Sequence, residues 1–118
     1  MSNSHVRKGE YIKFREDGVF MKHYFGKADN DRLNNFEIVI LPGYQISPHI
    51  HEETSEFFYV VSGKGELWHE GNWKPVEKGD AFTAPMKVEH GLRNQTPMKC
   101  LSCCQPSARL YGRGETFG

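Results

Sequence analysis

The sequence predicts an all-β domain, folded as a sandwich or a barrel, on three observations. Short runs of apolar, aromatic and β-branched residues recur along the chain, and glycine, proline, asparagine or aspartate separates them. No segment keeps a helical period over three turns. The 118 residues suffice for one domain but leave too little core for a second. We therefore expect a single domain over residues 1–118, with its barrel core at about 10–105 and an irregular, Gly-rich tail at 106–118.

Nine runs have the composition and length of strands, and most end at a recognisable turn. The first two flank the turn sequence REDG at 15–18, and the third ends at Pro42-Gly43. Pro75 lies in the short run WKPV, which suits an edge strand because proline cannot donate to the ladder. The expected strands are 11–14, 19–25, 36–41, 55–63, 64–71, 73–76, 80–85, 89–94 and 98–104.

Charge and hydropathy argue against two classes of partner. The 15 basic residues balance 15 acidic ones and form no basic run or stripe, so we expect no nucleic-acid partner. No apolar stretch approaches the length of a membrane-spanning helix, so we expect no membrane partner. The first residues, MSNSHVRKGEY, lack the apolar segment of a secretory signal, and we therefore expect a cytoplasmic protein.

The 3 cysteines, Cys100, Cys103 and Cys104, form a poor disulfide framework because their number is odd and they cluster near one end of the chain. Cys100 and Cys103 have a C-x-x-C spacing, but on a strand they point to opposite faces and cannot share a metal. We expect them to pack as small, soft side chains. The sequence leaves open whether Cys100, Ser102 and Cys104 face the interior, or Leu101 and Cys103.

Two histidines and a glutamate lie close together in the segment SPHIHEETSE, residues 47–56. On an extended strand His49 and His51 project from one face, because residues i and i+2 face the same way. A new strand then begins, and Glu56 lies on one of its faces. If the two segments are neighbouring strands of one sheet, the three side chains converge at one end of a cavity. Two imidazoles and a carboxylate are ligands that a divalent transition metal accepts.

His90 is a candidate fourth ligand in a later strand. Alternation along a strand places Phe58 on the face of Glu56 and Leu92 on the face of His90, so we expect Phe58 and Leu92 to line the cavity. Two other strand histidines are expected at the surface: His23 and His69.

Two segments of the chain resemble the sequence motifs of the cupin superfamily. The first motif is a glycine, a His-x-His pair, a glutamate and a second glycine at fixed spacing, and the second ends in a histidine and an asparagine. The matching residues are Gly43, His49, His51, Glu56 and Gly63, and then Gly79, Pro85, His90 and Asn94. One position departs, because Lys87 stands where the motif has a glycine that gives the turn its backbone freedom. The chain is identified as a small single-domain cupin of the type-2 barrel kind.

The resemblance implies an antiparallel β-barrel of the jelly-roll kind. It implies one divalent transition metal near one mouth, bound by His49, His51, Glu56 and His90. The metal is Fe, Mn, Ni, Co, Cu or Zn, since imidazole and carboxylate ligands suit all of these. It further implies a small-molecule ligand or substrate, and a homodimer formed by pairing or exchange of an N-terminal strand.

Three functions are compatible with this site. The first is a metal-dependent enzyme acting on a small polar molecule, a dioxygenase or an isomerase or lyase, in which Glu56 doubles as a catalytic base. The alternative is a non-catalytic cupin module that holds a metal or a small ligand for sensing or storage. The third is a structural or interaction protein that no longer needs its metal. The preference for a dioxygenase or isomerase rests on the family, because no residue here decides the reaction.

Overall fold

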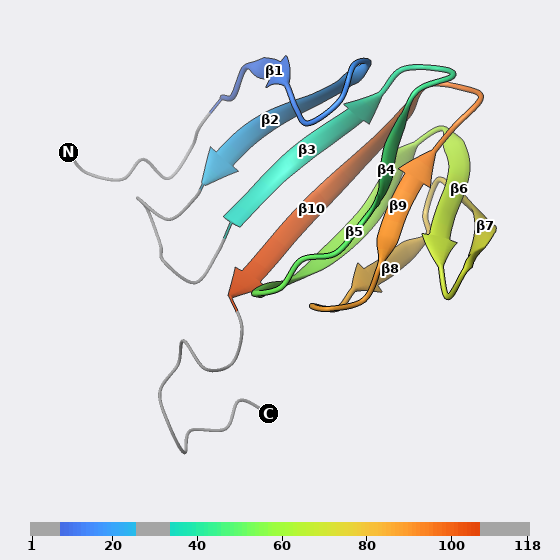
Figure 1. Ribbon diagram of the computed structural model, residues 1–118. Helices are drawn as coiled ribbons and strands as arrows, with labels where there is room; N and C mark the ends of the chain where they lie inside the picture. Colours follow the sequence, from blue (N-terminus) through green and yellow to red (C-terminus); the bar gives the residue numbers. More distant parts are fainter. Residues whose placement is uncertain (1–7, 26–33, 107–118) are drawn as a thin grey trace.

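The computed structural model describes residues 8–25 and 34–106, with side chains up to Ser102. In these ranges the chain forms ten strands and no helix, as Figure 1 shows. Each of the nine predicted runs corresponds to a strand, and the tenth strand contains the first histidine of the His-x-His pair. The strands are β1 (Tyr11–Lys13), β2 (Val19–Phe25), β3 (Asn34–Ile40), β4 (Gln45–His49), β5 (Thr54–Ser62), β6 (Lys64–His69), β7 (Asn72–Glu77), β8 (Ala81–Ala84), β9 (His90–Arg93) and β10 (Met98–Pro106).

Two antiparallel sheets form a jelly-roll sandwich (Figure 1). The larger sheet has the strand order β1-β2-β3-β10-β5-β8, and the smaller sheet has the order β4-β9-β6-β7. The prediction of an all-β, jelly-roll fold is therefore confirmed, although the two sheets remain open at their edges and do not close into one continuous barrel. Pro75 lies in β7, at the edge of the smaller sheet, as its missing donor predicts.

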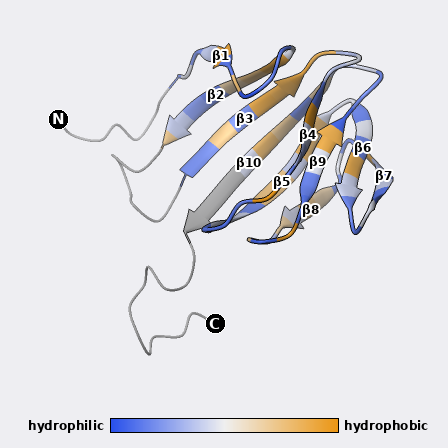
Figure 2. Cartoon of the chain, in the orientation of Figure 1, coloured by the Kyte–Doolittle hydropathy of each residue, from blue (hydrophilic) through white to orange (hydrophobic). Residues whose placement is uncertain are grey.

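Alternation along the strands decides which side chains enter the interior. In β5, Glu56 and Phe58 are buried, whereas Phe57 and Tyr59 are exposed on the outer face of the sheet. Figure 2 shows β3 as hydrophilic at its start and hydrophobic at its C-terminal end, where residues 38–40 lie. The buried hydrophobic residues of both sheets form one cluster, which contains Val19, Phe36, Ile38, Ile40, Ile46, Phe58, Val60, Leu67, Val76, Ala84, Leu92, Met98 and Cys100.

The His-x-His segment and the strand of Glu56 are not neighbours in one sheet, which was the condition considered for their convergence. β4 pairs with β9 in the smaller sheet, whereas β5 pairs with β10 and β8 in the larger sheet. Residues 50–53 connect the two sheets after β4 ends at His49. His49 and Glu56 therefore approach each other across the interior of the sandwich, because the two sheets pack face to face.

The inward face of β10 is the face of Cys100 and Ser102, a choice that the sequence left open. Both side chains are buried, whereas Leu101 is exposed. Burial raises the pKa of the Cys100 thiol to about 12, so the thiol stays protonated and serves as a packing group, as predicted. The side chains of Cys103 and Cys104 lie outside the described residues, as does the predicted tail beyond Pro106, the last residue of β10.

In the described ranges the chain forms no helix with the length and apolar character needed to span a membrane.

Two statements about the cell and the assembly stay predictions. The cytoplasmic location is a prediction from the sequence. The homodimer is also a prediction; the N-terminal strand β1 that it invokes lies at the edge of the larger sheet.

Candidate metal centre

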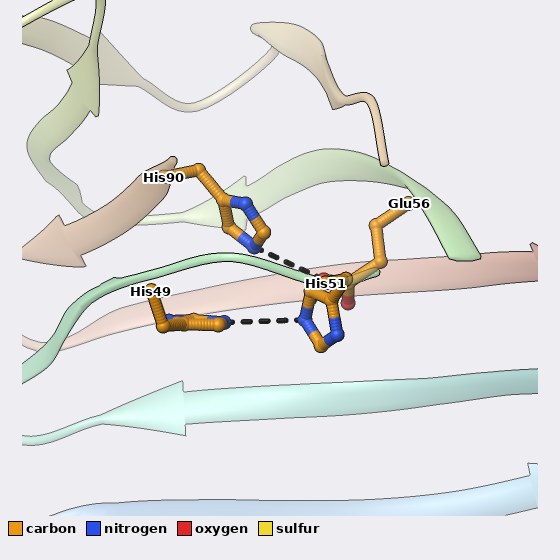
Figure 3. A group of neighbouring side chains, drawn as sticks. All are labelled: His49, His51, Glu56 and His90. Carbon is orange, nitrogen blue, oxygen red and sulfur yellow. Dashed lines mark hydrogen bonds and ion pairs between the residues drawn. The ribbon is translucent and has the colours of Figure 1, made fainter. Parts of the chain in front are cut away.

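Four side chains, from both sheets and from the segment that connects them, converge between the sheets, as Figure 3 shows. Nε2 of His49 lies 3.2 Å from Nε2 of His51, and Oε1 of Glu56 lies 3.1 Å from Nε2 of His51. The same glutamate oxygen lies 3.2 Å from Nε2 of His90. One ligand atom from each of the four residues lies within 4.8 Å of all the others. The structure thus brings together the whole predicted set, and their role as metal ligands is the prediction that this geometry supports.

A bulge between β4 and β9 sets His49 opposite His90. The two strands are in register at Ile46 and again at His49, but the two residues of β4 between them oppose Gly91 alone. A Cβ on Gly91 would lie 2.8 Å from the carbonyl oxygen of Ile46 and 2.9 Å from the nitrogen of Pro48. Glycine therefore permits the close approach of the strands, and it leaves the rings of His49 and His90 with centroids 4.4 Å apart.

Backbone carbonyls orient two of the imidazoles. Nδ1 of His49 donates to the carbonyl oxygen of Ser47 over 2.8 Å, and Nδ1 of His90 donates to that of Val88 over 3.2 Å. Because a carbonyl oxygen only accepts, each Nδ1 bears the hydrogen and each Nε2 presents a lone pair to the cluster. Histidines that bind metals are held in the same way by a hydrogen bond from the other ring nitrogen.

The buried end of the cluster fits a metal ion. Glu56 is 7% exposed and His90 is 4% exposed. Among the described residues, Nε2 of His90 has no hydrogen-bond partner, although it lies 3.2 Å from Oε1 of Glu56. A buried polar atom without a partner is costly, and a divalent cation at the centre of the four ligands would satisfy it.

Ser102 contacts the cluster, a contact that was not predicted from the sequence. Its hydroxyl donates to Oε2 of Glu56 over 3.3 Å. The two carboxylate oxygens are thus divided, with Oε2 toward the serine and Oε1 toward the imidazoles. The two residues are far apart in the sequence, so only the pairing of β10 with β5 brings them together.

In the turn before β9 a lysine stands where the cupin motif has a glycine. Lys87 has a φ of 67°, which is the left-handed conformation that glycine adopts most easily. This costs about 1–2 kcal/mol for a residue with a Cβ. The backbone N–H of Lys87 donates to the carbonyl oxygen of His51 over 2.6 Å, and this hydrogen bond connects the turn to the segment that contains His51.

A cavity of about 330 Å³ opens onto the cluster, near the lower end of the range for small-molecule pockets. Phe58 and Leu92, the two residues expected from alternation, are part of its lining. Phe58 stacks on Phe82 with centroids 5.1 Å apart and lies 6.3 Å from the ring of His90. The other apolar side chains of the lining are Phe14, Met21, Phe36, Ile38 and Ile46. Apart from the four candidate ligands, the polar side chains of the lining are Arg15, His23, Asn34 and Thr54.

The sequence assigned the two remaining strand histidines to the surface. His69 is half-buried, is absent from the lining of the cavity, and lies 3.6 Å from the exposed carboxylate of Glu70. His23 is exposed, as predicted, but it also lines the cavity, and its Nε2 lies 2.6 Å from Oδ1 of Asn34. No local pattern distinguishes these two residues, because the difference depends on which strand borders the opening.

Burial lowers the pKa of both His49 and His51 below the ordinary value of 6.5. Nearby positive charge acts in the same direction, since His90 and Arg15 both disfavour a proton on either ring. Glu56 opposes the shift at His51 but does not reverse it. Both imidazoles are therefore neutral near pH 7, which is the state that binds a metal.

The metal-free protein is expected to lose stability as the pH falls below about 6.5, through His49 and His51. In that range the unfolded chain takes up protons that the folded chain refuses, so the folded state is disfavoured as the pH falls from 6.5 toward the lowered pKa values. Urea unfolding at about pH 7.5 and about pH 5 measures this loss. A His49→Gln, His51→Gln variant without metal is expected to lose less stability over the same range, and an equal loss would contradict the pKa assignment.

Comparison with known proteins places this chain in a family. A profile described as "Cupin domain" matches residues 36–104. A protein of Aquifex aeolicus (strain VF5) called "Uncharacterized protein" is 30% identical over 92 residues, which cover 78% of this chain and 74% of that protein. The protein called "Polyketide synthase CurC" of Streptomyces cyaneus is 34% identical over 56 residues, which cover 48% of this chain but only 36% of that protein.

A solved structure has the same fold. The crystal structure of an RmlC-like cupin from Shewanella frigidimarina NCIMB 400 superposes with a TM-score of 0.77 and 23% sequence identity. The match covers 93% of this chain and 97% of that one. The profile match, the Aquifex relative and the group of three histidines and a glutamate agree with one another, and the chain belongs to the cupin family.

Proposed function

We propose that this cupin is a metal-dependent enzyme that acts on a small molecule with two neighbouring oxygens, by an isomerase-type reaction. The observation that supports the proposal most strongly is the position of the four ligand atoms, which lie within 4.8 Å of one another at a cavity of about 330 Å³. A divalent metal bound there supplies a Lewis acid that polarises a carbonyl oxygen.

The side chains of the chain itself provide the rest of the chemistry. Oε1 of Glu56 faces the interior of the cluster, while the Ser102 hydroxyl holds Oε2 in place. When Oε1 is only loosely bound to the metal, Glu56 can accept a proton there from the hydroxyl-bearing carbon next to a carbonyl and return it to the carbonyl carbon, while the hydroxyl proton passes to the former carbonyl oxygen. This transfer needs no oxidant or reductant. The rings of Phe58 and Phe36 help to exclude water from the same space.

The lining of the cavity limits the substrate. Apart from the four candidate ligands, its apolar side chains outnumber its polar ones, so a substrate with an apolar body and an oxygen-bearing end fits better than one that is polar throughout. The relative named as a polyketide synthase supports including oxygen-rich ring compounds among the candidates.

Deuterium incorporation tests the proposed reaction. Protein loaded with Zn²⁺, Mn²⁺ or Fe²⁺ is incubated in D₂O with 2-oxo acids, hydroxy-ketones and β-diketones, and exchange and isomer formation are followed by NMR. We expect exchange with the loaded wild type and a loss of at least about a hundredfold in the His90→Ala variant. Binding without turnover of any compound would contradict the enzyme and favour the non-catalytic module. Oxygen uptake that depends on the metal would replace the isomerase by a dioxygenase.

A further inference from the structure

Arg15 has an unusual backbone at the mouth of the cavity. It lies in the turn between β1 and β2, and its φ is 66°, in the left-handed region. The N–H of Glu16 donates to the carbonyl oxygen of Phe14 over 2.8 Å, which makes Arg15 the central residue of a three-residue γ-turn. With a positive φ this turn is rare and strained, and strain of this kind clusters at functional sites.

Hydrogen bonds connect this turn to β4, the strand that contains His49. The carboxylate of Glu16 accepts a hydrogen bond from the backbone N–H of Ser47 over 2.5 Å and another from the hydroxyl of Ser47 over 2.9 Å. Ser47 in turn accepts the hydrogen bond of His49 through its carbonyl oxygen. The position of Arg15 is thus fixed relative to the metal cluster, and its side chain lines the same cavity.

The guanidinium group of Arg15 is available to a ligand. In the described part of the chain no carboxylate forms an ion pair with it. Its Cζ lies 6.0 Å from the centroid of the Phe14 ring. The two acidic neighbours are engaged elsewhere, because Glu16 binds Ser47 and Asp17 pairs with Lys13 at 2.6 Å. A planar guanidinium presents parallel donors that match the two oxygens of a carboxylate.

We propose that Arg15 is a specificity-determining residue that binds the carboxylate of the substrate. The substrate class is then a small carboxylic acid with an apolar or aromatic body, whose other oxygens reach the cluster of His49, His51, Glu56 and His90. This inference rests on the proposed function, since it takes the metal cluster to be the other end of the binding site.

A matched pair of ligands tests the role of Arg15. Titration calorimetry on Zn²⁺-loaded protein compares 3,4-dihydroxybenzoate with 4-methylcatechol, which has the same ring and neighbouring oxygens but a methyl group in place of the carboxylate. The wild type is expected to prefer the acid by about tenfold. Arg15→Met is expected to lose that preference and to bind 4-methylcatechol as the wild type does. Lys22→Met, which removes a charge from β2 at a residue outside the cavity lining, is expected to keep it.

A second variant separates recognition from a structural role. Arg15→Gly suits the left-handed backbone, so its urea midpoint is expected to be no lower than that of the wild type while its preference for the acid is lost. A preference that persists in Arg15→Met, or that is absent in the wild type, would overturn the role of Arg15 alone. Binding of both compounds that is the same with and without Zn²⁺ would overturn the proposed function as well.

Discussion

The Glu56→Gln variant is expected to bind a divalent metal more than about a hundredfold more weakly than the wild type. This loss of affinity is larger than the loss usually caused by mutating a residue that only hydrogen-bonds a metal ligand. The amide keeps the size of the side chain but removes the negative charge that lies 3.1 Å and 3.2 Å from two of the imidazoles. It also replaces one of the acceptor oxygens by a donor. Competition with a chromophoric chelator measures the affinity directly.

Ser102→Ala is the matched control for this change. It leaves the carboxylate in place and removes only the hydrogen bond to Oε2, so a loss of about tenfold is expected. Equal metal affinities for the two variants would contradict the assignment of Glu56 as a ligand.

The Gly91→Ala variant is expected to lose about 3 kcal/mol of unfolding free energy, at the upper end for an overpacked interior. The added methyl group would meet backbone atoms of Ile46 and Pro48 at 2.8 Å and 2.9 Å, and these atoms cannot rotate away as a side chain can. Because the same contact holds β4 against β9, separation of the strands also moves His49 from His90, and we expect metal affinity to fall together with stability. Urea unfolding and chelator competition measure the two effects.

Gly71→Ala provides the control for a glycine without such contacts. Gly71 lies in the turn between β6 and β7, and no atom stands within 4 Å of the position of a Cβ. Its positive φ predicts a loss of about 1–2 kcal/mol from backbone strain, with no change in metal affinity. An effect of Gly91→Ala as small as this one, with metal affinity unchanged, would contradict the role of the bulge.

Much of the fold could be predicted because strands leave a local record in the sequence. The alternation of Glu56 and Phe58 with Phe57 and Tyr59 gave the inward face of β5, and turns at glycine and proline separated the strands. The pairing of the strands could not be predicted in this way. No residue near His49 indicates that its strand pairs with the strand of His90, because that contact joins segments that are far apart in the sequence.

The candidate site was also predicted only in part from the sequence. The spacing of His49, His51 and Glu56, together with His90, was sufficient to predict the group of four side chains that the structure brings together, because it matches the order of the cupin motifs. The residues that hold or complete the site come from other strands and turns. Ser102 contacts Glu56 from β10 and Arg15 lines the cavity from the turn before β2, and in the sequence each is an ordinary polar residue.

The departure at Lys87 shows where a motif can mislead. The glycine of the motif favours a left-handed backbone, but its absence does not remove that backbone, since Lys87 adopts a φ of 67° and keeps the hydrogen bond to His51. The lysine therefore causes backbone strain at position 87, but the hydrogen bond to His51 is kept.

The measurement that tests the central claim most directly is elemental analysis of the purified protein without an affinity tag, beside the His49→Ala, His90→Ala double variant. The account predicts about one equivalent of a transition metal per wild-type chain, as expected for a single three-histidine, one-carboxylate site, and none in the folded double variant. A wild-type protein that contains no metal and takes up none when it is added would contradict it.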